Sequence, residues 1–191
     1  MPCANLVIVG SSTGGPKILR RFFNRMPSLQ ACVLVVQHMP HFVNESLCRT
    51  IGAETPMPTA LVTDGVRLAA GQVLVAPSDV HSVIFANTTI RLRNSEKVQF
   101  VRPSIDVTMK SVHHGFRKLC AVILTGMGRD GAEGIVHIRS LGGETFAQDR
   151  HTCVIYGMPK AAAETGAVQH VMEPEQIRDT LIERFAAAVP A

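Results

Sequence analysis

The chain alternates between short apolar runs and segments rich in glycine, proline and polar residues. Short runs that are rich in β-branched residues and bounded by turn residues predict β-strands. Such runs begin at Leu6, Cys32, Gln72, Ser82, Thr89, Ala121 and Glu144. The runs LVIV, VLVV and AVIL are apolar at every position, which is typical of parallel strands covered on both faces. The pattern therefore predicts a parallel sheet at the centre of the protein.

Segments with helical spacing lie between several of these runs. Apolar residues recur every three or four positions around residues 18–23, 104–116, 135–141 and 177–185, which predicts amphipathic helices. Alternating strands and helices indicate the α/β class, with a doubly wound, mostly parallel sheet flanked by helices. The sequence FANTTI joins the runs that begin at Ser82 and Thr89, and it predicts an antiparallel hairpin that elaborates the sheet.

Length and composition fit one ordinary soluble domain over residues 1–191, because 46% of the 191 residues are hydrophobic. No apolar run reaches the ~18 to 20 residues that span a bilayer, and the start of the chain lacks a signal peptide. We therefore expect a cytoplasmic protein without membrane insertion, and take a monomer as the default. The formal net charge of +4 is too small to indicate a nucleic-acid partner.

Charge, cysteine and histidine patterns add little chemistry. The first predicted helix carries Lys17, Arg20, Arg21 and Arg25, and no acidic residue precedes Glu45, so this end of the molecule is expected to be positive. The five cysteines form no CxxC pair and are expected to be buried free thiols. The histidines that follow residue 100 show no spacing of metal ligands, so no metal site is expected.

A glycine cluster, GSSTGGP, follows the first predicted strand and precedes the first helix. A phosphate-binding P-loop is excluded because Pro16 stands where its lysine is needed, and a dinucleotide loop is excluded by the glycine spacing. The remaining functional interpretation is a nucleophile turn of the form G-x-S-x-G, which has Ser12 at its centre. A purely structural turn remains an alternative on this pattern alone.

A serine nucleophile needs a base, and the base needs an acid to orient it. Functional groups in a parallel sheet gather at the carboxyl ends of the strands. His38 ends the run CVLVVQH and is the leading candidate base, while Asp130 follows AVILTGMGR and is the leading candidate acid. The chain order Ser, His, Asp differs from that of α/β-hydrolases, which indicates a different hydrolase fold.

Rival acids and a rival nucleophile remain open. Asp149 follows the strand ETFAQ, and Asp79 lies in APSDVH, so either could take the place of Asp130. Cys153 could in principle act as a nucleophile, but no turn presents it, and we expect it in the core.

These segments resemble the catalytic domain of the CheB family of bacterial chemotaxis methylesterases, the protein-glutamate methylesterases and protein-glutamine glutaminases. The motifs that carry the resemblance are GSSTGGP, VVQHMP, DGVRLAAGQVLVAPSDVH, RPSIDVTMKSV, VILTGMGRDGAEG and AQDRHTCVIYGMPKAA. The resemblance implies that Ser12 is the nucleophile, His38 the base and Asp130 the orienting acid. It also implies that Met127 contributes its backbone to the oxyanion hole and that Thr13 helps to shape the site.

The implied reaction is hydrolysis of glutamyl methyl esters on the cytoplasmic helices of methyl-accepting chemoreceptors, with release of methanol. Deamidation of receptor glutamines is implied as a second activity, and no cofactor is implied. An alternative of another class is a catalytically idle receptor-binding module that docks through the basic residues Arg20, Arg21 and Arg25.

The sequence departs from the family pattern in two places. Family members usually carry an amino-terminal receiver domain, whereas this chain begins almost at the first catalytic strand, so we expect no receiver domain and leave regulation open. Arg129 stands where many relatives have Asn or Asp, which should change the local electrostatics and leave Asp130 in place.

Overall fold

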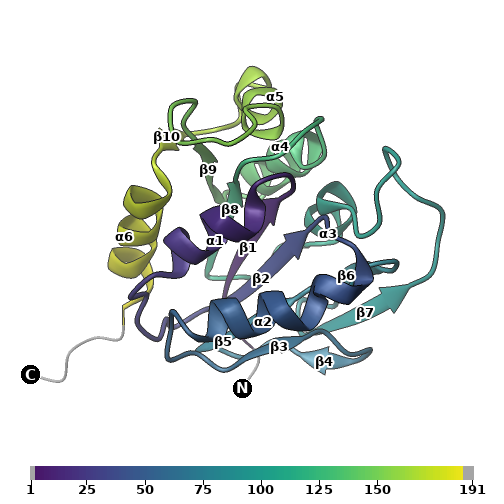
Figure 1. The fold of residues 1–191 in the computed structure, drawn as a ribbon. Helices are drawn as coiled ribbons and strands as arrows, with labels where there is room; N and C mark the ends of the chain where they lie inside the picture. The colour runs from purple at the N-terminus through teal and green to yellow at the C-terminus, as the bar shows by residue number, and fades with distance from the viewer. Residues whose placement is uncertain (1–2, 187–191) are drawn as a thin grey trace, which may run out of the picture.

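The protein is described by a computed structural model that covers residues 3–186 (Figure 1). Within these residues, seven parallel strands form the central sheet in the order β10-β9-β8-β1-β2-β5-β3. The strands are β1 (Asn5–Ser11), β2 (Cys32–Gln37), β3 (Thr59–Leu61), β5 (Gln72–Val75), β8 (Lys118–Ile123), β9 (Glu144–Gln148) and β10 (His170–Met172). The continuous apolar runs of the sequence lie in β1, β2 and β8, which occupy the middle of this sheet and are buried on both faces.

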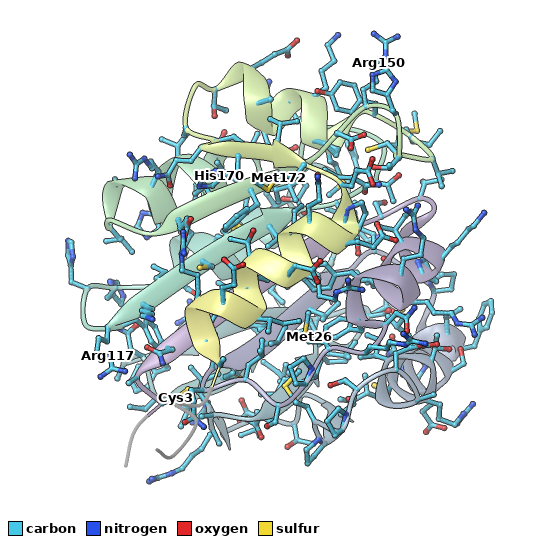
Figure 2. The ribbon with its side chains drawn as sticks, turned by 90° about the vertical axis from the view of Figure 1, so that its left-hand side faces the viewer. Cys3, Met26, Arg117, Arg150, His170 and Met172 are labelled. Atoms are coloured by element: carbon cyan, nitrogen blue, oxygen red, sulfur yellow. The ribbon has the colours of Figure 1, made fainter. Side chains whose placement is uncertain are left out.

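Helices cover both faces of the sheet because successive side chains of a strand point to opposite sides. Val7 and Val9 pack with α1, α2 and α6, and Figure 2 shows α6 lying across that face. Leu6 and Ile8 pack on the opposite face with α3, α4 and α5. The helices are α1 (Gly15–Phe23), α2 (Asn44–Gly52), α3 (Ile105–Lys110), α4 (Ala132–Ser140), α5 (Met158–Glu164) and α6 (Pro174–Phe185), and a 3-10 turn, η1 (His41–Val43), precedes α2. The predicted doubly wound α/β fold is confirmed.

The predicted hairpin is also confirmed, as β6 (His81–Phe85) and β7 (Thr89–Arg93). It does not extend the main sheet. It pairs with β4 (Val66–Arg67) to form a separate three-stranded antiparallel sheet, because β2 and β3 already occupy both sides of β5.

The helix expected over residues 104–116 is shorter than predicted and ends at Lys110. The chain beyond it is held by Asn87, which donates from Nδ2 to the carbonyls of His113 and His114 and accepts from the N–H of His113. These main-chain groups are therefore tied to the hairpin turn and do not continue the helix. The sequence patterns did not predict α2, β3, β4 or β10.

The positive face expected on the first helix is neutralised in part. Arg20 pairs with Glu54 at 2.8 Å, and Arg21 makes bonds of 2.8 and 3.0 Å to the two carboxylate oxygens of Glu175. Arg25 lies beyond the end of α1, in the left-handed region at φ +58°. Among residues 3–186, no helix has the length and apolar character needed to cross a membrane.

Candidate active site

Ser12 lies in the turn that joins β1 to α1, at the carboxyl edge of the sheet. Its N–H donates to the carbonyl of Thr125, which follows the neighbouring strand β8, at 2.9 Å. Its carbonyl accepts from the N–H of Gly15 at 2.8 Å, which closes the turn into α1. The turn passes through Gly14 at φ +80°, a conformation that glycine adopts without steric cost.

Close packing around Ser12 explains why a second glycine is needed nearby. A Cβ on Gly126 would lie 2.8 Å from the Cβ of Ser12 and 2.3 Å from the sulfur of Met158. Any larger residue at position 126 would therefore displace Ser12 or the first turn of α5.

Gln37 joins the segments of Ser12 and His38 through three hydrogen bonds. Its Oε1 accepts from the Ser11 hydroxyl at 2.6 Å, and its Nε2 donates to the carbonyls of Ser12 and His38 at 2.9 and 2.7 Å. Ser11 is fully buried, so its hydroxyl serves this contact and does not face solvent. A Cβ on Gly15 would lie 1.8 Å from Oε1 of Gln37, so Gly15 leaves the space that Gln37 fills.

His38 follows β2 and faces Asp130, which lies in the turn between β8 and α4. Nε2 of His38 is 2.8 Å from Oδ2 of Asp130, and the two side chains are 11% and 5% exposed. An imidazole that donates from Nε2 to a carboxylate keeps Nδ1 as its acceptor. Within residues 3–186, no hydrogen bond joins the Ser12 hydroxyl to this imidazole; such contacts often tighten only when substrate binds.

The Asp130 carboxylate accepts four hydrogen bonds, one of them from His38. The other three come from the start of α3: the Ser104 hydroxyl at 2.8 Å and the N–H groups of Ile105 and Asp106 at 2.7 and 3.0 Å. Burial alone would raise the pKa of Asp130, but the bonds from His38, from the two N–H groups and from Ser104 outweigh it and lower the pKa. Asp130 is therefore held as a carboxylate, the form that stabilises a protonated imidazole.

A second buried carboxyl group, Asp106, stands behind Asp130. It accepts from the N–H groups of Gly131 and Gly134 at 2.9 and 2.7 Å and from Nε2 of Gln99 at 3.0 Å. Burial raises the pKa of Asp106 to about 6, opposed by the Gly134 N–H and reinforced by the charge of Asp130.

Sequence reasoning missed Asp106 and Gln37, because their roles depend on contacts with residues up to 28 positions away. One local signal pointed to the start of α3, where Asp106 lies. Ser104 precedes an apolar segment as a helix N-cap would, and its hydroxyl accepts from the N–H of Val107.

Thr13 and Met127 flank the serine. The side chain of Met127 is 75% exposed. Within the described part of the chain, the main-chain N–H groups of both residues donate no hydrogen bond. Val154 and Ile155 are also exposed apolar residues, and their loop packs on the site, since a Cβ on Gly14 would lie 2.5 Å from the Cβ of Val154. The site thus has an apolar rim, formed by Met127, Val154 and Ile155.

Among residues 3–186, neither rival carboxylate bonds to His38. Asp149 accepts from the N–H and hydroxyl of Thr152, which closes its own turn. Asp79 is exposed in the loop after β5. Cys153, expected in the core, is only half-buried because its loop lies at the surface; burial and the charge of Asp149 raise the pKa of its thiol to about 12. Such a thiol is not a nucleophile near neutral pH.

Fold and site together define a class: a doubly wound α/β protein with a serine and a histidine–carboxylate pair at the carboxyl edge of neighbouring strands. Comparison with known families assigns it more narrowly. The family described as CheB methylesterase matches residues 7–181, and the chain belongs to this family.

Individual relatives agree with this assignment. A protein-glutamate methylesterase/protein-glutamine glutaminase of Symbiobacterium thermophilum is 43% identical over 178 residues, which cover 92% of this chain and 49% of the relative. One of the same name from Haloarcula marismortui is 39% identical and is covered over 51% of its length. The crystal structure of the Thermotoga maritima CheB methylesterase catalytic domain superposes with a TM-score of 0.86 at 35% identity, covering 94% of this chain and 97% of that one. The chain therefore spans about half the length of the curated relatives and nearly all of the solved catalytic domain.

Proposed function

We propose that this protein is a serine esterase that hydrolyses glutamyl methyl esters on the cytoplasmic helices of chemoreceptors and also deamidates receptor glutamines. The observation that carries the chemistry is the buried pair of His38 and Asp130 at the end of the strand next to Ser12. The names of the relatives support the choice of glutamyl side chains as substrate.

In the proposed reaction, Oγ of Ser12 attacks the ester carbonyl carbon while Nδ1 of His38 takes the hydroxyl proton. Asp130 holds the ring through Nε2 and stabilises the positive charge that the imidazole acquires. The tetrahedral intermediate collapses, methanol leaves with the proton from His38, and a glutamyl ester of Ser12 remains. Water then attacks the carbonyl carbon of this ester while Nδ1 of His38 takes a proton from the water. Oγ of Ser12 leaves with that proton, and the glutamate side chain is released.

The negative oxygen of the intermediate needs donors that are not already engaged. The N–H groups of Thr13 and Met127, which donate to no other group among residues 3–186, are the proposed oxyanion donors. The exposed apolar rim next to them would contact the methylene groups and the helical surroundings of the substrate residue.

Methanol release from methylated chemoreceptor membranes tests the proposal. Ser12→Ala should lower turnover at least ~10³-fold while the fold stays intact, as loss of a triad nucleophile does elsewhere. Ser46→Ala is the matched control, because within the described residues the Ser46 hydroxyl bonds only the carbonyl of Val43, at the surface. Methanol release by Ser12→Ala at the wild-type rate would contradict the proposal.

The idle receptor-binding module loses its main support in the structure. Two of the arginines that motivated it are engaged in ion pairs, Arg20 with Glu54 and Arg21 with Glu175. The basic surface that was expected to attract acidic receptor helices is therefore compensated in part.

A further inference from the structure

Asp106 occupies an energetically unfavourable place. Its side chain is almost fully buried, and another carboxylate, Asp130, lies beside it. Among residues 3–186, no lysine or arginine forms an ion pair with Asp106, since the nearby Lys110 pairs with Glu133 of α4. Burying a charged group near a like charge disfavours its ionised form. A neutral serine or asparagine could bond the N–H groups at the start of α4 without this cost.

Two contacts of Asp106 lie at Asp130 or at the residue that follows it. We propose that Asp106 is a positioning residue for Asp130 and holds it from two sides. On one side, the N–H of Asp106 donates to Oδ1 of Asp130 at 3.0 Å. On the other, Oδ1 of Asp106 accepts from the N–H of Gly131, the residue that directly follows Asp130, at 2.9 Å.

This double hold has a consequence for the imidazole. With Oδ1 of Asp130 bound by Ser104 and Asp106, the plane of the carboxylate is fixed and Oδ2 points to Nε2 of His38. The N–H of Gly134 donates to Oδ1 of Asp106, which ties the start of α4 to α3 and so holds the turn before α4, where Asp130 lies, against the helix that carries Asp106. Catalytic geometry tolerates little displacement: a misplacement of about 1 Å can cost ~10²-fold in rate.

Two substitutions at Asp106 separate positioning from stability. Asp106→Asn keeps an oxygen acceptor for Gly131 and Gly134, and the amide of Gln99 can turn to accept from the new Nδ2. Asp106→Ala removes the acceptor. This test of rate rests on the proposed function. We expect kcat for methanol release to fall ~10-fold or more in Asp106→Ala, with KM within about twofold of wild type. In Asp106→Asn, kcat should fall less than ~5-fold.

A second readout does not depend on esterase activity. The proton on Nε2 of His38 should give a low-field NMR resonance in the wild-type protein and in Asp106→Asn, because its bond to Asp130 is intact. It should broaden or disappear in Asp106→Ala. If wild-type protein released no methanol, the proposed function would fail, while the resonance would still test the positioning role.

Glu173→Ala is the control for a lost helix cap, because Glu173 caps α6 through a capping box far along the chain from the site. It should lower the unfolding temperature with kcat unchanged. If Asp106→Ala does not fold, Asp106→Leu takes its place, because leucine fills the space without offering an acceptor to Gly131 or Gly134, and it should lower kcat in the same direction. Wild-type kcat together with an unchanged His38 resonance in Asp106→Ala, or in Asp106→Leu where that one is used, would overturn the inference.

Discussion

Gln37 holds the two strand ends of the site together, so its replacement should affect stability and rate at once. Gln37→Met keeps the length of the side chain and removes both amide atoms. The change deletes three hydrogen bonds, of 2.6, 2.9 and 2.7 Å, to Ser11, Ser12 and His38. At a net ~1 kcal/mol for each bond, the free energy of unfolding should fall by about 3 kcal/mol. A domain of this size then loses roughly 6 to 12 °C in unfolding temperature and stays folded at room temperature.

The assay combines thermal unfolding with methanol release measured well below the transition. Without the bonds from Gln37 to the carbonyls of Ser12 and His38, the relative position of these two residues is no longer fixed. We therefore expect kcat to fall ~10-fold or more. Gln72→Met is the matched control, because the amide of Gln72 bonds the carbonyl of Arg67 and, weakly, Sγ of Cys32, both at the other end of the sheet from the site. It should change stability by less than ~1 kcal/mol and leave kcat unchanged. Equal effects of the two substitutions on both quantities would refute the role given to Gln37.

Three further outcomes follow from the structure. Gly126→Ala should lower kcat ~10-fold or more, because the new Cβ would lie 2.8 Å from that of Ser12; kinetics equal to wild type would contradict the close packing. The pKa of Asp106 is raised to about 6 in the folded protein. The stabilisation linked to its proton is therefore complete below the ordinary pKa near ~4 and is lost as pH rises toward 6. In urea unfolding, the stability of wild type relative to Asp106→Asn should fall between pH 4 and 6, and a pH-independent difference would argue against this burial. Because the pKa of Cys153 is about 12, native protein should react slowly with iodoacetamide at that thiol at pH 7, and labelling at the rate of a free thiol would contradict it.

The central sheet was predictable because β1, β2 and β8 contain the runs LVIV, VLVV and AVI, which are apolar at every position, a pattern typical of strands covered on both faces. Candidate site residues were found by one rule, that chemistry gathers at the carboxyl ends of such strands. The rule selected Ser12, His38 and Asp130, and the structure brings the last two into contact.

Other features left no local trace in the sequence. The strands β3 and β10 have three residues each and lie at the two edges of the main sheet, so their pairing depends on neighbours already in place. A hairpin signal specifies β6 and β7 but does not say which sheet they join. Gln37 and Asp106 act through side-chain contacts between segments far apart in the chain, and no periodicity records such contacts.

The central claim is that Ser12, rather than its neighbour Ser11, is the nucleophile. Intact-mass analysis and peptide mapping after treatment with a fluorophosphonate measure this directly, because the reagent bonds covalently to an activated serine. We expect one adduct per chain, located on Ser12, absent in Ser12→Ala and formed much more slowly in His38→Ala. An adduct on Ser11, whose hydroxyl is buried against Gln37, or equally fast labelling in His38→Ala, would contradict the account.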